Sequence, residues 1–231
     1  MSSSRATLAA LAGVVLAVLA GCTSGAPSSG GPSPTRRTTP SSTSTTPAPR
    51  DTSTRTRTAS LTIPAIGLKD LRVIPYQGTT DDWPGTRIQN RGVAASPYGD
   101  HGGVGPGEVG NYLVTAHRLS AGGPLRALPS LGRHDSVLVT SHGVVYEYEI
   151  VKTRETSFRS QSSLAEQRAA VPGSPGEHPR KAMITISTCA TPEDNAAGDL
   201  WRDDKGNPEH RIDKIGVLTS TRKASDHPAS P

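Results

Sequence analysis

Short apolar stretches with a period of two residues recur through the central and C-terminal parts of the chain, separated by Gly, Pro and Asp. In the clearest of them Tyr146, Tyr148 and Ile150 alternate with glutamates, which is the pattern of a strand with one buried and one exposed face. The stretches that predict strands are Leu61–Ile66, Asn111–His117, Ser136–Thr140, Val144–Lys152, Met183–Cys189 and Ile212–Leu218, with weaker candidates at Leu71–Ile74 and Thr153–Ser157. The folded part is therefore expected to be dominated by strands.

Helical signals are few and short. The run Pro124–Leu128 offers one apolar pair before Pro129 stops it, and Ser163–Val171 is long enough for about two turns. His142-Gly143 predicts a tight turn between two of the strands. Because strands do not alternate with long helices, the pattern favours a mostly antiparallel barrel or sandwich with short helices.

The N-terminus carries the pattern of an export signal. Arg5 precedes an apolar stretch at Ala6–Ala20, which is shorter than the roughly 20 residues of a membrane-spanning helix. The stretch ends Leu19-Ala20-Gly21-Cys22 and resembles the bacterial lipobox. The resemblance implies a lipoprotein signal peptide over 1–22 with lipid on Cys22. The alternatives are an ordinarily cleaved signal and an uncleaved signal anchor, each with an incidental cysteine.

A linker rich in Ser, Thr and Pro follows the signal over residues 23–60. It lacks the apolar residues needed to offset chain entropy, so we expect a disordered tether. Its arginines contribute to the net charge of +5 and serve either attraction to anionic lipid or wall polymer, or solubility alone. We expect one catalytic domain over residues 61–220 and a disordered tail over 221–231.

One glycine-rich motif is misleading. Gly105-Pro-Gly-Glu-Val-Gly110 satisfies the dinucleotide-binding fingerprint literally, but that fingerprint needs a strand before it and a helix after it. Here a loop precedes the motif and a strand follows, so we expect a tight turn at Pro106-Gly107. We expect neither a cofactor nor a nucleic-acid partner.

Cys189 is the only cysteine of the expected domain, and an unpaired thiol in an exported protein is a candidate nucleophile. A thiol with a pKa near 8.5 needs a neighbouring imidazole or cation to react as thiolate. His117 and Arg211, each at the end or start of a predicted strand, are the candidates for these roles. By strand parity His117 shares a face with Thr115, and Cys189 shares one with Ser187.

At these residues the sequence resembles the sortases. Thr185-Ile-Ser-Thr-Cys189 is similar to the sortase signature T-L-x-T-C, and Asn111–Arg118 is similar to the strand that carries the sortase histidine. Ile63–Gly67 also fits the start of a sortase domain. The resemblance covers nearly all of Leu61–Leu218 and is strongest to the actinobacterial class E group, with class F the nearest rival.

The resemblance implies an eight-stranded β-barrel with His117, Cys189 and Arg211 as catalytic residues. Arg202 is the alternative arginine, because sortases of this group carry theirs closer to the cysteine, and an insertion precedes Arg211. Candidate residues of the substrate groove are Thr188, Ala190 and Trp201. The acidic residues of the insertion lack the EF-hand spacing and predict a solvated loop, so no metal is expected. The other histidines of the expected domain lie in polar or glycine-rich loops and are expected at the surface; they are His101, His134, His142, His178 and His210.

The resemblance further implies a transpeptidase at the extracytoplasmic face of the membrane. Cys189 would cleave the Thr–Gly bond of an LAxTG- or LPxTG-like sorting motif through a thioacyl enzyme. The acceptor would be an amine of a cell-wall precursor or of another protein. Two alternatives stay open: a sortase-like barrel that acts as a non-catalytic binding or assembly module, and an unrelated wall-binding lipoprotein.

Overall fold

The structure is a computed structural model that describes residues 53–224. The export signal with Cys22, most of the tether and most of the C-terminal tail lie outside the described residues. Among the helices of the described part, none has both the length and the apolar character that a membrane span requires.

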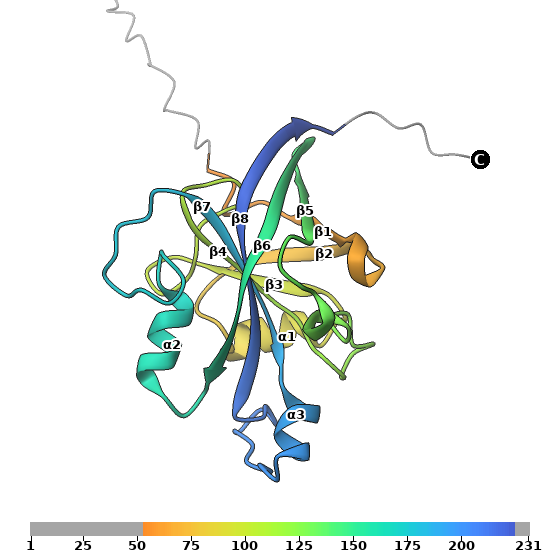
Figure 1. Cartoon of the computed structure of the whole chain (residues 1–231), viewed down its shortest axis with the longest axis vertical. Helices are drawn as coiled ribbons and strands as arrows, with labels where there is room; N and C mark the ends of the chain where they lie inside the picture. Colours follow the sequence, from red (N-terminus) through yellow and green to blue (C-terminus); the bar gives the residue numbers. More distant parts are fainter. Residues whose placement is uncertain (1–52, 225–231) are drawn as a thin grey trace, which may run out of the picture. The chain divides into compact units, whose positions relative to one another are not determined.

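The strands form a closed barrel in the order β1-β2-β3-β4-β7-β8-β6-β5. β2 pairs with β3 and β4 with β7 in parallel, whereas the other neighbours are antiparallel. The strands are β1 Ala59–Ile63, β2 Leu68–Gln77, β3 Ala94–Tyr98, β4 Gly110–Thr115, β5 Ser136–Ser141, β6 Val144–Ser157, β7 Ala182–Cys189 and β8 His210–Lys223. The long strands β6 and β8 run side by side across the barrel (Figure 1). The expectation of a mostly β, eight-stranded barrel with short helices is confirmed.

Period-two alternation explains the barrel interior. Leu61 and Ile63 of β1, Val139 of β5 and Tyr148 of β6 are each completely buried. Their sequence neighbours on the same strands are more exposed. The inward face predicted for Tyr148 and Ile150 is therefore confirmed.

The parallel pair β4–β7 is buried on both faces. Tyr112 and Ile184 point into the core, while Asn111 and Thr185 meet on the opposite face, where the Thr185 hydroxyl donates to Asn111 Oδ1 at 2.8 Å. Helix α2, Gln161–Arg168, covers that face, and Asn111 Nδ2 donates to the carbonyl of Gln167. Burial on two faces is usual for parallel strands, and the register of the pair fixes the level at which both strands end.

The ordered domain is longer than the expected range 61–220. β1 begins at Ala59, and the backbone N–H of Thr54 donates to Glu108 Oε1 at 2.7 Å, so residues expected in the tether belong to the domain. β8 continues to Lys223, which pairs with Val144. The pairing with β6 supplies hydrogen-bond partners to residues that were expected to be a disordered tail.

The weak strand candidates Leu71–Ile74 and Thr153–Ser157 are confirmed as parts of β2 and β6, whereas other elements differ from the sequence expectations. Pro124–Leu128 forms turns before a 3-10 helix, η2, at Leu128–Ser130. A second 3-10 helix, η1 at Pro64–Ile66, interrupts the predicted first strand. Strand β3 and the short helices α1 Trp83–Gln89 and α3 Thr191–Ala196 were not expected. Pro97 disfavours a strand in β3, and tertiary pairing with β2 overrides that preference.

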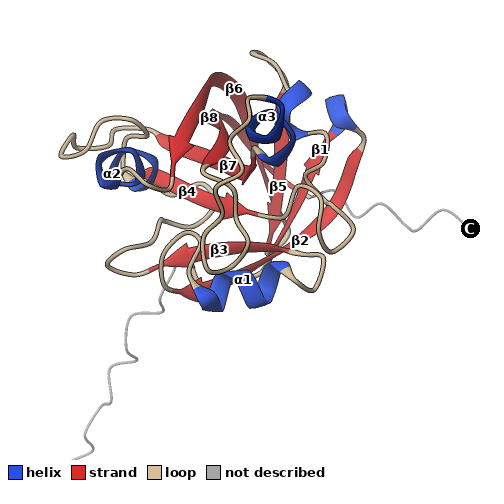
Figure 2. Ribbon diagram, turned by 90° about the horizontal axis from the view of Figure 1, so that it is seen from below, coloured by secondary structure: helices blue, strands red, loops and turns tan. Residues whose placement is uncertain are grey.

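Helix α1 is started by its capping residue. The Asp82 carboxylate accepts a hydrogen bond from the backbone N–H of Gly85 at 2.7 Å, and Pro84 occupies the first turn. The helix packs against β3 and β2 on one side of the barrel (Figure 2). It thereby fixes the loop between β2 and α1, residues 78–82, beside the barrel end.

The expected tight turn at Pro106-Gly107 is present. The N–H of Glu108 donates to the carbonyl of Gly105, and Gly107 has φ +78. Its N–H also donates to the Tyr148 hydroxyl at 2.8 Å. A Cβ placed on Gly107 would lie 2.2 Å from the Tyr146 ring, whereas one on Gly143, at φ +71, would meet nothing within 4 Å.

Gly107→Ala should destabilise the domain more than Gly143→Ala. Both variants carry the left-handed strain of about 1–2 kcal/mol, and Gly107→Ala adds an overpacking cost on the order of 1–3 kcal/mol. Urea unfolding of the two variants and the wild type measures the difference. Equal losses in the two variants would show that the Tyr146 ring does not restrict this turn.

Candidate active site

Strand register brings the predicted site residues to one end of the barrel. In the parallel pair β4–β7, Thr115 stands opposite Ser187. His117 and Cys189 each follow two residues later, so the ends of two adjacent strands present them at the same level. On the other side of β7, Cys189 pairs directly with Arg211 of β8.

A cavity of about 150 Å³ opens at this end of the barrel. One wall is the segment after β4, with His117 and the exposed Leu119, and the other is the connection from β7 to β8, with Lys205 and Asn207. Cys189 lies between the two walls and is partly exposed. The cavity therefore brings the histidine and the thiol within one small volume.

Arg211 is held tightly beside the sulfur. Its side chain is 3% exposed, and Nη1 lies 3.1 Å from Cys189 Sγ. The guanidinium stacks on the Phe158 ring at 3.9 Å and forms an ion pair with Asp81, with Nη2 3.0 Å from Oδ1. A buried guanidinium needs such partners, because a charge removed from water is costly unless it is paired.

Asp81 was not anticipated from the sequence. It lies in the loop before α1, far from Arg211 along the chain, and its side chain is 7% exposed. The Asp-Asp pair before Trp83 and Pro84 was a signal for a helix start, but nothing local pointed to an arginine on β8.

Burial and charge set the resting protonation of the site. Burial raises the pKa of the Cys189 thiol, and the positive charge of Arg211 opposes this rise. Burial also lowers the pKa of His117, and Arg211 lowers it further, against the opposing charge of Asp81. The two directions favour neutral thiol and neutral imidazole over the ion pair.

The orientation of His117 is set by helix α1. Its Nε2 lies 2.7 Å from Asn90 Oδ1 at the C-terminal end of the helix. Because an amide oxygen only accepts, this contact places the hydrogen of neutral imidazole on Nε2 and leaves Nδ1 as the basic nitrogen.

Thr188 and Ala190 support the site from below and do not line it. They are 1% and 0% exposed, so their expected place in a substrate groove is wrong. The Thr188 hydroxyl donates to the carbonyl of Ala116 at 2.8 Å, which ties β7 to the residue before His117. The Ala190 N–H donates to the His210 carbonyl at 2.9 Å and is therefore not free for a substrate oxyanion.

Arg118 steadies the end of β7. Its Nη1 donates to the Cys189 carbonyl at 3.3 Å, and the guanidinium also holds Glu193 of α3 through both of its terminal nitrogens. Sequence reasoning gave Arg118 no role, although a bidentate carboxylate contact is typical of arginine.

The alternative residues of the insertion lie elsewhere. Trp201 packs near Arg159, with 5.9 Å between the guanidinium carbon and the ring centroid, and is not among the described residues that line the cavity. Arg202 donates to Asn195 and to the carbonyl of Trp201. The described contacts of the Cys189 sulfur thus favour Arg211 over Arg202 as the arginine of the candidate site. The connection also reaches α1, because Lys205 lies over the Trp83 ring at 5.4 Å.

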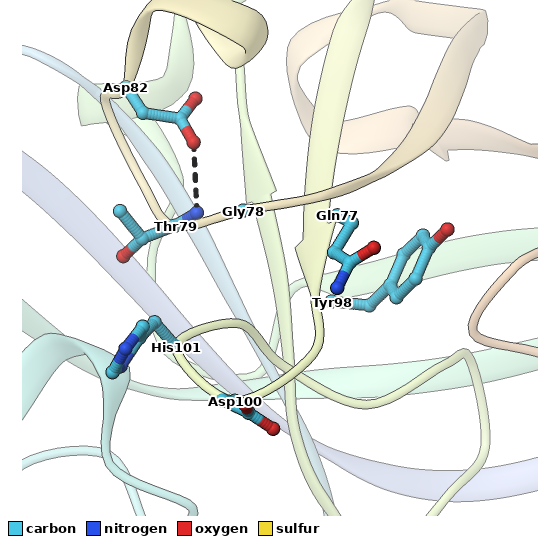
Figure 3. A pocket seen from close by; sticks show the side chains of 7 residues that line it. All are labelled: Gln77, Gly78, Thr79, Asp82, Tyr98, Asp100 and His101. Carbon is cyan, nitrogen blue, oxygen red and sulfur yellow. Dashed lines mark hydrogen bonds between the residues drawn. The ribbon is translucent and has the colours of Figure 1, made fainter. Parts of the chain in front are cut away.

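A larger cavity of about 280 Å³ lies behind the loop of residues 78–82 (Figure 3). Both oxygens of its Asp82 carboxylate already accept backbone hydrogen bonds, from Thr79 and Gly85. Tyr98, Asp100 and His101 complete the polar part of its wall. None of its lining residues is a cysteine, so it offers no thiol.

Within residues 53–224, one group of side chains has donor atoms close enough for a metal. Asp194, Asp199 and His210 place ligand atoms within 4.8 Å of one another. Asp194 is 5% exposed and accepts from the His210 ring and from its backbone N–H. The expectation of a solvated loop is wrong for Asp194, whose carboxylate instead joins α3 to β8.

Comparisons with known proteins agree with this geometry. A model of the family described as the sortase domain matches residues 61–200, more than half of the chain. Sortase E1 of Streptomyces coelicolor is 20% identical, with a TM-score of 0.54 over 78% of this chain and 96% of its own. SrtA of Actinomyces oris is 18% identical, with a TM-score of 0.56 over 76% and 85%.

A third solved structure is similar in the same way. SrtF of Corynebacterium diphtheriae is 18% identical, with a TM-score of 0.52 over 75% of this chain and 90% of its own. At these identities the structural likeness shows the shared fold. Among curated proteins no match was found.

Alkylation of Cys189 by iodoacetamide should rise with pH and reach half its maximum above about pH 8.5, the value of an ordinary thiol. Burial raises the pKa of Cys189, so the reactive thiolate forms at higher pH than in an unfolded chain. Mass spectrometry of the peptide containing Cys189 measures this residue alone. The same chain in urea is the control and should give the ordinary midpoint. A midpoint in the folded chain at or below the control value would contradict the neutral resting state.

Proposed function

Because this chain belongs to the sortase family, whose members are cysteine transpeptidases, we propose that it cleaves a C-terminal sorting motif at the cell surface and transfers the protein to an amine. The observation that carries this proposal is the arrangement around Cys189. Its sulfur shares a small cavity with His117 and lies 3.1 Å from Arg211.

The first half of the reaction forms a thioacyl enzyme. The Cys189 proton passes to the imidazole of His117, and the sulfur attacks the carbonyl carbon of the Thr–Gly bond. Arg211 first attracts the negative charge on sulfur and then the oxyanion, for which its fork of N–H donors is suited. The imidazolium returns its proton to the leaving glycine nitrogen, the C–N bond breaks, and the threonine carbonyl remains bonded to sulfur.

The second half reverses these roles. An amine enters, His117 takes its proton, and the nitrogen attacks the thioacyl carbon. The C–S bond breaks, the new amide is released, and the sulfur regains its proton from the imidazolium. We propose an amine of a cell-wall precursor or of another protein as the acceptor.

The proposed substrate is an LAxTG- or LPxTG-like motif, in keeping with a class E sortase, with class F as the alternative. The relative from Streptomyces coelicolor was solved with a tripeptide in its active site, which supports peptide binding at the equivalent place here. A narrow cavity with Leu119 at its rim suits an extended chain with a small residue next to the cleaved bond.

We further propose that the domain works at the extracytoplasmic face of the membrane, held by lipid on Cys22. Residues 23–52 would then separate the domain from the bilayer. A signal anchor over the same N-terminal stretch is the alternative. No cofactor or metal takes part in the proposed chemistry.

A non-catalytic binding module is the second candidate function. The connection from β7 to β8 narrows the cavity with Lys205 and Asn207, and a site closed to peptides would still offer a folded barrel to a partner. Peptide cleavage separates the two candidates.

The full chain should cleave a fluorogenic LAxTG-type peptide, and Cys189→Ala should abolish cleavage, because no other described side chain near His117 offers a comparable nucleophile. Arg211→Lys keeps the charge but loses the fork, so kcat should fall on the order of 100-fold or more. Steady-state fluorescence measures both effects.

Arg202→Lys is the matched control for the arginine. It makes the same change in a side chain that contacts Asn195 and not the sulfur, so cleavage should stay near the wild-type rate. A large loss in Arg202→Lys with normal turnover in Arg211→Lys would transfer the assignment to Arg202. Absence of cleavage across a panel of sorting peptides would favour the binding module.

Labelled palmitate should enter the wild-type chain in cells and be lost in Cys22→Ala. The paired acyl chains of a lipoprotein bury enough CH₂ groups for stable anchoring, whereas one chain holds only marginally. Cys189→Ala is the control and should keep the label. Incorporation that persists in Cys22→Ala would contradict the lipoprotein anchor.

A further inference from the structure

Asp81 holds one edge of the Arg211 guanidinium. Arg211 Nε and Nη2 both donate to Asp81 Oδ1, at 3.3 and 3.0 Å. The remaining terminal nitrogen, Nη1, is the one that faces Cys189 Sγ. With Phe158 against the face of the guanidinium, the position of Nη1 is determined by Asp81.

The loop that carries Asp81 is tied on both sides. The Thr80 hydroxyl donates to Gln167 Oε1 at 3.0 Å, and Gln167, 1% exposed, donates in turn to Asp213. On the other side Asp82 accepts from the N–H of Thr79 and caps α1. The residue between these anchors cannot move without breaking buried hydrogen bonds.

Asp81 has two features that lower the stability of the folded domain. Its backbone is left-handed, with φ +65, and the buried carboxylate oxygen Oδ2 has no hydrogen-bond partner within residues 53–224. Both features cost free energy, and such outliers gather at functional sites. The stability of the domain alone does not account for them.

We propose that Asp81 is a positioning residue for the transpeptidation: it aims Arg211 at the reacting sulfur and balances the arginine's charge, so that Cys189 rests as the thiol. The inference rests on the proposed function for its effect on turnover. Its effect on the thiol is independent of any substrate.

The charged groups around the sulfur determine in which direction the pKa of Cys189 should change when Asp81 is replaced. Arg211 and a hydrogen bond involving Arg118 favour the thiolate, whereas Asp81 and Asp203 disfavour it, and His117 across the cavity is held neutral mainly by burial. Without the charge of Asp81, the effect of Arg211 on the thiol is opposed by only one carboxylate, the more weakly acting Asp203. The pKa of Cys189 should then fall, while the guanidinium loses the contact that orients it.

The test compares the full-length wild type with Asp81→Asn and Asp81→Gly, both of which suit a left-handed backbone. In each variant Cys189 should be alkylated faster at neutral pH, by roughly threefold for each unit that its pKa falls, because the gain in thiolate outweighs the loss of nucleophilicity. In contrast, kcat for the sorting peptide should fall by about tenfold or more, with KM nearly unchanged.

Asp70→Asn is the matched control. It removes the same charge from another aspartate with a left-handed backbone, φ +50, which is exposed on β2 and contacts Ser60 and Thr62. It should leave both alkylation and kcat near wild type. Thermal unfolding of every variant reports folding. Faster alkylation with lower kcat, in variants that unfold near the wild-type temperature, is the expected result.

Alkylation and kcat that both stay at wild-type values would overturn the proposal, as would a parallel fall of both with a lower unfolding temperature, which marks a purely structural role. If the wild type cleaves no peptide, the proposed function fails. The alkylation shift then still decides whether Asp81 controls the thiol.

Discussion

The buried guanidinium of Arg211 is the constraint around which this end of the barrel is built. A charge that is 3% exposed is tolerated only with close partners, and it has three: the Asp81 carboxylate, the Phe158 ring and the Cys189 sulfur. Each comes from a different part of the chain. The pairing of β7 with β8 supplies the sulfur, and the loop before α1 supplies the carboxylate.

The same arrangement explains why Cys189 rests as a neutral thiol. Burial acts against charge on both Cys189 and His117, and the pair Arg211–Asp81 adds little net charge beside them. The thiolate and imidazolium that the proposed attack needs are thus a minority form at neutral pH. In the proposed mechanism, a bound peptide carbonyl gives Arg211 a second acceptor as the oxyanion develops, so the arginine contributes most in the transition state.

The features that could be predicted from the sequence are those that depend on neighbouring residues in the chain. The alternation around Tyr148 and the turn at Gly107 follow from strand period and backbone freedom. Parity put His117 on the same face as Thr115 and Cys189 on the same face as Ser187, and the contact between Asn111 and Thr185 shows that these two faces meet. The pairing of the two strands themselves was not readable from one sequence.

The features that the sequence did not predict correctly have physical explanations. Strand β3 contains Pro97 and lacks β-branched residues, so its pairing with β2 and β4, and not its own sequence, makes it a strand. Asp81 acts through a contact between distant parts of the chain that no local signal reports. Thr188 and Ala190 stand beside the nucleophile in sequence, yet the pleat and the start of α3 turn both inward. Adjacency in a strand was therefore a poor guide to adjacency in the site.

The proposed chemistry requires that Cys189 is acylated during turnover. Acid quenching of the full chain during reaction with a sorting peptide, followed by peptide mapping with mass spectrometry, tests it directly. The peptide containing Cys189 should gain the mass of the substrate fragment that ends in threonine, and an added amine should remove this mass. Cleavage that proceeds with the acyl fragment on another residue, or with no covalent adduct at any quench time, would contradict it.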